Sequence, residues 1–203
     1  MIYRDFHREN EIGNDVIKKY SDILPKELIS IWKKYGTGSM MNGFLKVVNP
    51  DEYIEILRES FADYEGVVPV MLTAFGDIIT INSEGRVDII YYRYGYYSVI
   101  ATGWEMFEVF AGDSFMNERM FKNILYNAAV EKHGRVEFEE CFGYVPLLAL
   151  GGNETVDNLK KIKTKEHIEV IIEMVGIISD MKSIINNINS PLTINSYYVS
   201  KSC

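Results

Sequence analysis

The chain has 203 residues, of which 47% are hydrophobic, and it carries a formal net charge of −8. No apolar run reaches the roughly 18 residues that a membrane-spanning helix needs, and the N-terminal MIYRDFHREN lacks the apolar core of a signal peptide. Two cysteines make no disulfide framework, so we expect a cytoplasmic globular protein. Acidic side chains far outnumber basic ones between residues 51 and 157. This imbalance excludes direct nucleic-acid binding and favours a basic protein partner.

The N-terminal segment NDVIKKYSDILPKELISIWKKYGTG predicts two helices. Pro25 suits the first turn of the second helix, since its missing N–H would have no helical partner there. Gly36 is placed to end that helix in the left-handed conformation. A short strand is expected within GFLKVVNP.

A helix with one acidic edge is expected over residues 49–63. Asn49 is placed to cap it, with Pro50 at its first position. The expected buried stripe is Tyr53, Ile54, Leu57 and Phe61. The candidate partner-binding residues are Asp51, Glu52, Glu55, Glu59 and Asp63. This acidic edge is equally consistent with a device for solubility and with a docking surface.

Between residues 67 and 101 the pattern becomes typical of strands. The segment is rich in β-branched and aromatic residues and is interrupted by glycines. It predicts an antiparallel meander with strands near 70–75, 78–82, 87–93 and 97–101.

The C-terminal part predicts further helices and two short strands. Helices are expected over 104–110 and 117–133, and another is expected to be capped by Thr164. The apolar segment 143–152 is interpreted as a buried strand covered on both faces, and a second strand is expected near 158–162. The Asn- and Ser-rich residues after 178 are interpreted as a short helix followed by a loose tail.

No set of side chains indicates a catalytic, metal or cofactor site. The three histidines lie in separate predicted elements, and no phosphate-binding or nucleophile motif is present. Cys141 has apolar neighbours and is interpreted as a small buried hydrophobic residue. His167 is expected to be a surface residue or a capping residue of its helix. Glu137, Glu139 and Glu140 could act as the paired acids of a hydrolase, although a solvated face is the more ordinary interpretation.

Five segments in a fixed order carry a family resemblance: IWKKYGTG, MNGFLKVVNPDEY, TAFGD, ECFGYVPLLALGG and NLKKIKTKEHI. Together they resemble a bacterial family with a GAD-like N-terminal half and a C-terminal half that is found at the end of type VI secretion immunity proteins. The resemblance covers roughly residues 3 to 178. It divides the chain into a GAD-like region over 1–103, an immunity-protein region over 104–178 and a tail over 179–203.

The resemblance implies an immunity protein that binds and blocks a secreted toxin, often a DNase, without catalysing a reaction. It also implies a fold similar to that of the SUKH immunity proteins. We therefore expect an α+β protein with a mostly antiparallel sheet flanked by helices, as a single compact unit or one with two lobes. The expected partner is a cognate, basic toxin; no cofactor and no membrane are expected, and the sequence does not indicate an oligomeric state. The alternatives are a regulatory or scaffold module that binds another protein, and the glutamate-dependent hydrolase.

Overall fold

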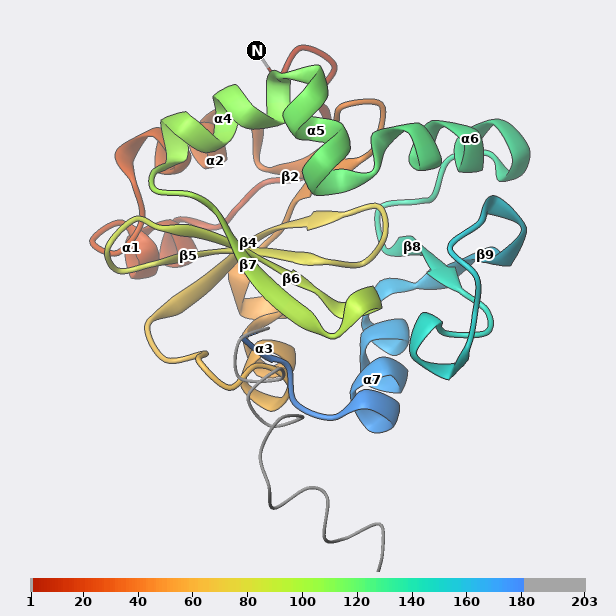
Figure 1. Ribbon diagram of the computed structural model, residues 1–203. Coiled ribbons are helices and arrows are strands. Elements are labelled where there is room, and N and C mark those ends of the chain that lie inside the picture. Colours follow the sequence, from red (N-terminus) through yellow and green to blue (C-terminus); the bar gives the residue numbers. More distant parts are fainter. Residues whose placement is uncertain (1, 181–203) are drawn as a thin grey trace, which may run out of the picture.

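The computed structural model describes residues 2–180 as an α+β protein (Figure 1). Its main sheet has eight strands in the order β1-β2-β3-β4-β5-β6-β7-β10, antiparallel except for the last pair. These strands are β1 (His7–Asn10), β2 (Thr37–Met40), β3 (Leu45–Val47), β4 (Val67–Thr73), β5 (Ile78–Asn82), β6 (Val87–Tyr91), β7 (Tyr96–Ala101) and β10 (Ser179–Asp180). A separate antiparallel pair is formed by β8 (Glu140–Tyr144) and β9 (Leu159–Lys163).

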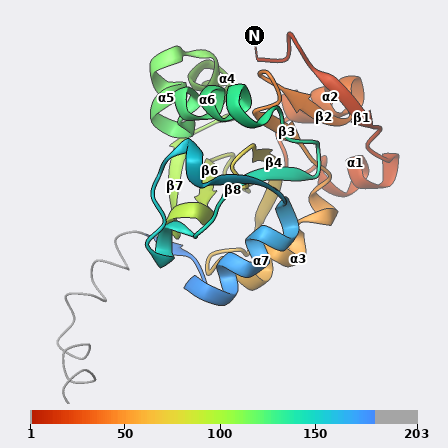
Figure 2. The same cartoon turned by 90° about the vertical axis from the view of Figure 1, so that its right-hand side faces the viewer.

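Helices cover both faces of the main sheet (Figures 1 and 2). One face carries α1 (Asn14–Tyr20), α2 (Lys26–Tyr35), α4 (Trp104–Gly112), α5 (Ser114–Phe121) and α6 (Asn123–His133). The other face carries α3 (Ile54–Ser60) and α7 (Thr164–Val175). Short 3-10 turns occur at Pro50–Glu52, Tyr92–Tyr94, Leu148–Leu150 and Val156–Asn158.

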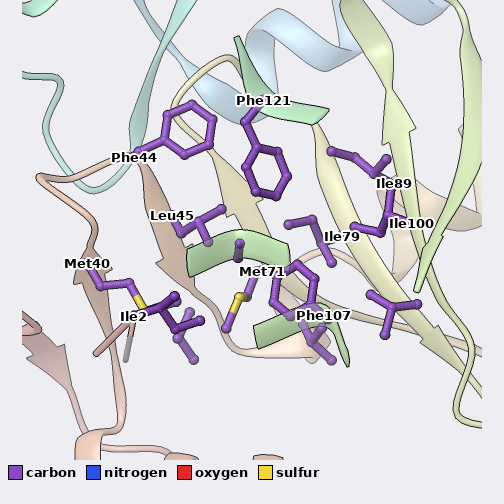
Figure 3. Packing of buried hydrophobic residues seen from close by; sticks show 14 of the residues in the cluster. Ile2, Met40, Phe44, Leu45, Met71, Ile79, Ile89, Ile100, Phe107 and Phe121 are labelled. Carbon is purple, nitrogen blue, oxygen red and sulfur yellow. The ribbon is translucent and has the colours of Figure 1, made fainter. Parts of the chain in front are cut away.

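The double cover explains why the central strands are apolar at nearly every position. Successive side chains of a strand point to opposite faces, so Ile79 and Ile78 belong to different hydrophobic clusters. Both faces are buried, and both therefore require apolar side chains. Figure 3 shows the larger cluster, where Phe44 and Phe121 pack with their ring centroids 5.3 Å apart. This contact joins the two halves of the chain in one core.

Much of the predicted order is confirmed. The two N-terminal helices, the four-stranded meander, the helix at 104 and the strand near 158–162 are all present. Gly36 ends α2 with φ of 73°. Strands β1 and β2 were missed, because their four-residue segments are too short and polar to show a strand pattern. The expected helix and tail after 178 fall almost wholly on residues outside the described range, which stops at 180.

The predicted helix over 117–133 is wrong, because the structure has two helices there. Lys122 adopts the left-handed conformation, with φ of 58° and ψ of 49°, and separates α5 from α6. The break shifts the helical phase. As a result Ile124 is exposed, whereas Tyr126 and Ala129 are buried.

The interpretation of 143–152 as one buried strand is also wrong. Strand β8 ends at Tyr144, and the chain then forms a loop with a 3-10 turn at Leu148–Leu150. Leu150 is exposed, and Leu148 is only partly buried. An apolar composition by itself does not tell whether a segment is covered by other elements.

Buried Lys46 links strand β3 to the turn that precedes β8. Its side chain is almost fully buried, and its Nζ donates to the carbonyl oxygens of Glu137 at 2.9 Å, Phe138 at 3.1 Å and Glu140. Burial lowers the pKa of this ammonium group to about 8. The three carbonyl groups offset the cost of taking the charged amine out of water.

Replacing Lys46 with Met should destabilise the protein by about 2–4 kcal/mol, because the alkyl chain remains but the buried carbonyl groups lose their donor. Urea denaturation of Lys46→Met and of the exposed control Lys160→Met measures this difference. The control should change the free energy of unfolding by less than about 0.5 kcal/mol. Equal stability of the two variants would show that Lys46 does not hold the turn.

Candidate partner-binding surface

The five acidic residues proposed from the sequence are all exposed, but they do not lie on one helix. Glu55 and Glu59 lie on α3, whereas Asp51 and Glu52 belong to the preceding 3-10 turn. Asp63 follows the end of the helix. The expected single helix over 49–63 is therefore broken at Tyr53, although Asn49 does cap its start by accepting from the N–H of Asp51 at 3.1 Å.

Several of these carboxylates are engaged with other side chains. Asp51 accepts from Lys19 Nζ at 2.5 Å and from the Tyr20 hydroxyl at 2.7 Å. Burial acts to raise the pKa of Asp51, but these two hydrogen bonds outweigh it and lower the pKa. Asp51 thus ties the turn to α1, and it is less available to a partner than its exposure alone indicates.

Each of the other four carboxylates contacts at most one side chain. Glu52 lies 3.8 Å from Lys165, and Glu55 lies 2.7 Å from Arg58 within α3. Such exposed pairs contribute little to stability and are easily rearranged. Asp63 accepts from the Tyr97 hydroxyl at 3.1 Å, and Glu59 has no hydrogen bond or ion pair with any described residue.

Helix α7 extends the acidic surface beyond the residues that the sequence singled out. It packs against α3 on the same face of the sheet (Figures 1 and 2). Glu166, Glu169 and Glu173 are exposed on it, at spacings of three and four that place them on its outer side. The same spacing is visible in KEHIEVIIEMV, so the sequence contained a signal for these acids.

Large apolar side chains lie exposed among the acids of α7. Val170 and Met174 are 45% and 57% exposed, and Ile177 just beyond the helix is 65% exposed. Ile168 and Ile171 on the inner side are buried. We define the α3–α7 surface by the exposed acidic and apolar residues of the two helices and of the segments that follow them: Glu55, Glu59, Asp63, Glu166, Glu169, Val170, Glu173, Met174 and Ile177. Two exposed basic residues, Arg58 and Lys165, lie on the same helices. Apolar side chains surrounded by charged ones are the usual anatomy of a protein interface.

A second set of exposed apolar side chains lies on the opposite face of the sheet. Val109, Phe115 and Ile124 are exposed on α4, α5 and α6. This layer carries five acidic residues between 104 and 133, but Arg119, Lys122 and Lys132 offset three of them, so its excess of negative charge is smaller than that of α3 and α7.

The glutamates near 140 do not have the environment of a hydrolytic acid pair. The exposed Glu139 accepts from Lys163 Nζ at 2.8 Å, and this hydrogen bond lowers its pKa. A general acid needs the opposite shift, toward neutral pH. The carboxylate of Glu140 accepts from the backbone N–H of Glu137 at 3.1 Å and so closes the turn.

The surroundings of Cys141, His167 and Thr164 indicate structural roles for these residues. Cys141 is buried, and burial raises the pKa of its thiol to about 12. His167 was expected to be a surface or capping residue, but it is buried against Gly143, where no side chain larger than hydrogen would fit beside its ring. Burial lowers the pKa of His167. Thr164 was expected to cap α7 but is its first buried residue, and its side chain makes no capping bond.

Two features are absent from the described residues. Among residues 2–180, no three His, Cys, Asp or Glu side chains are grouped as ligands for a metal ion. Within the same range, no helix combines the length and hydropathy that crossing a membrane requires.

Two regions of the chain match known protein families. Residues 3–92 match the GAD-like domain, and residues 105–175 match the C-terminal region of the type VI secretion (T6SS) immunity protein Tdi1. Among curated proteins, none is similar to this chain in sequence. The crystal structure of Atu4351 from Agrobacterium tumefaciens has a similar fold, with a TM-score of 0.64 at 14% identity. The match covers 83% of this chain and 86% of that one.

Native Cys141 should react slowly with thiol reagents, because the nucleophilic thiolate is scarce at neutral pH and the sulfur is covered. The measurement is the rate of labelling in a Cys203→Ser background, with and without denaturant. Cys141→Ala should cost roughly 1–2 kcal/mol of stability and leave partner binding intact. Rapid native labelling that abolishes partner binding would instead identify Cys141 as a functional thiol.

Proposed function

Since this chain belongs to the GAD-like type VI secretion immunity family, we propose that it binds a secreted toxin, a DNase of a type VI secretion system, and neutralises it without catalysis. The match of residues 105–175 to the C-terminal region of an immunity protein is the observation that carries this proposal. The chain acts in the cytoplasm, where an incoming or newly made toxin would reach the DNA of the cell.

The proposed docking site is the α3–α7 surface. Proteins that act on DNA carry basic side chains to contact phosphates. A surface with six exposed carboxylates, among them Glu59 and Glu169, complements such a partner. Occupation of the phosphate-binding groove by this surface would prevent DNA from entering it.

The two kinds of side chain on this surface have separate roles in the proposal. The carboxylates attract the partner at a distance and raise the association rate. Val170 and Met174 lose their contact with water in the complex, and burial of such anchors slows dissociation. Asp51, which accepts from Lys19 and Tyr20, is expected to contribute less than Glu59, which has no such partner among the described residues.

Replacing Glu55 and Glu59 with Lys should lower the association rate constant for the toxin by about tenfold or more at low salt. The fold should persist, because exposed charges contribute little to stability. Stopped-flow or surface-binding kinetics measure the rate, and the difference between wild type and variant should shrink as salt rises.

The matched control is the double variant Glu105→Lys and Glu131→Lys, which makes the same change of net charge on exposed positions of α4 and α6. It should keep most of the wild-type rate. If both double variants associate equally fast, the α3–α7 surface is not the docking site. If wild type binds no type VI secretion DNase of the strain that encodes it, the immunity role itself is wrong.

Replacing Val170 and Met174 with Ser should accelerate dissociation by about tenfold or more, with a much smaller effect on the association rate. The control is Val109→Ser with Phe115→Ser on the opposite face of the sheet. Both variants lose exposed apolar area, so their stabilities should be similar. Faster dissociation of the control alone would move the interface to the α4–α6 layer.

A further inference from the structure

The three most exposed large apolar side chains among residues 2–180 lie on one layer of helices. Ile124 on α6, Phe115 on α5 and Val109 on α4 are 71%, 70% and 67% exposed. All three lie outside the two hydrophobic clusters that the described residues form. Their helices lie on the face of the main sheet away from α3 and α7 (Figures 1 and 2). Apolar side chains gathered on an exposed surface mark contacts with another protein.

These three residues are close to one another in the chain and in the structure. Val109 lies one helical turn before the junction of α4 and α5, where the N–H of Asp113 donates to its carbonyl at 3.0 Å. Phe115 is in the first turn of α5, directly after the junction. The carboxylate of Glu118, one turn after Phe115, accepts from the N–H of Ile124 at 2.7 Å. We refer to Val109, Phe115 and Ile124 as the α4–α6 patch.

Two charges of opposite sign flank this patch. Glu105 precedes Val109 by four residues on α4. Arg119 follows Phe115 by four residues on α5. Residues at this spacing are neighbours on the surface of a helix. Glu105 and Arg119 are both exposed, and neither forms an ion pair or a hydrogen bond with a described residue. The order along the two helices is therefore acid, apolar, apolar, base.

We infer that the α4–α6 patch is the contact between two copies of this chain that are related by a two-fold axis. In such a dimer the same surface serves both copies, so each contact between two residues occurs twice. A surface with an acid at one end and a base at the other is then its own complement. With the apolar residues near the axis, Glu105 of one copy faces Arg119 of the other. The apolar side chains lose their contact with water, and the two ion pairs fix the orientation.

The charges of the molecule favour this layer over the α3–α7 surface for self-association. Two copies of the α3–α7 surface would bring carboxylates against carboxylates, and like charges in contact oppose association. A basic partner, conversely, is attracted more strongly by the α3–α7 surface than by a patch with one acid and one base. The two surfaces lie on opposite faces of the sheet (Figure 1), so both copies keep α3 and α7 free. If the proposed function holds, the dimer binds two toxin molecules.

Sedimentation velocity of the full chain, from low micromolar to near-millimolar concentration, tests this inference. A contact of this size should give a reversible dimer with a dissociation constant in the micromolar range. Replacing Val109 and Phe115 with Ser should weaken the dimer by about tenfold or more, because the apolar contact is lost. The matched control is Val99→Ser with Leu150→Ser, which removes exposed apolar side chains outside both surfaces and should dimerise as wild type does.

A charge exchange tests the two-fold arrangement itself. Glu105→Arg and Arg119→Glu should each weaken the dimer by about tenfold or more at low salt, because like charges then meet twice. The combined variant restores two pairs of opposite charge and should dimerise nearly as wild type does. Glu105→Arg also lowers the net negative charge of the chain, which by itself would favour association, so a weaker dimer of this variant is not an effect of net charge. Far-UV circular dichroism and thermal unfolding check that every variant is folded.

A wild type that stays monomeric at the highest concentration would overturn the inference. A combined charge variant that associates no better than the single ones, or a control that weakens the dimer as much as the patch variant does, would also overturn it. Faster toxin dissociation from the patch variant, together with a monomeric wild type, would assign the patch to the toxin instead. The sedimentation measurements contain no toxin, so their outcome does not depend on the proposed immunity function.

Discussion

The position of the proposed docking surface depends on one buried ammonium group. Lys46 on β3 holds three carbonyl groups of the turn at 137–140. The carbonyl of Glu139 in the same turn accepts from the N–H of Thr164 at 2.8 Å, and Thr164 is the first residue of α7. Hydrogen bonds to neighbouring carbonyl groups of this turn thus link the central sheet to the start of the acidic helix. Because Lys46 lies in the GAD-like region and the turn lies in the immunity region, this link also fixes the two matched regions relative to each other.

The doubly covered sheet determines what remains available for recognition. The central strands are buried on both faces, so a partner meets helices, turns, loops and the exposed strands β1 and β9. The helices on the two faces of the sheet differ in the side chains that they expose. Those on the α4–α6 face expose apolar side chains together with both acidic and basic ones, whereas α3 and α7 expose mainly carboxylates around Val170 and Met174. The α3–α7 surface therefore combines the larger excess of negative charge with apolar contact area.

The sequence predicts the fold correctly where the spacing of apolar residues matches their burial in the structure. The meander from β4 to β7 alternates between two buried faces, and its turns contain glycines with positive φ at Gly76, Gly85 and Gly95. The break at Lys122 has no such signal, because lysine rarely adopts the left-handed conformation. For the candidate surface, the acids of α3 were found from their spacing. The pairing of Asp51 with Lys19, and of Glu52 with Lys165, depends on contacts between residues far apart in the chain, and spacing cannot reveal such contacts. The burial of Arg93, which lies in a run of tyrosines, could not be predicted for the same reason.

Hydrogen–deuterium exchange of the chain, free and with its cognate toxin, tests the central claim most directly, since it maps the contact surface without mutation. The account predicts slower exchange of backbone amides in α3 and α7 in the complex. The amides of α4, α5 and α6 should exchange as they do in the free protein. Protection confined to the α4–α6 layer, or no protection at α3 and α7 in a complex that does form, would contradict the assignment of the α3–α7 surface as the site of toxin binding.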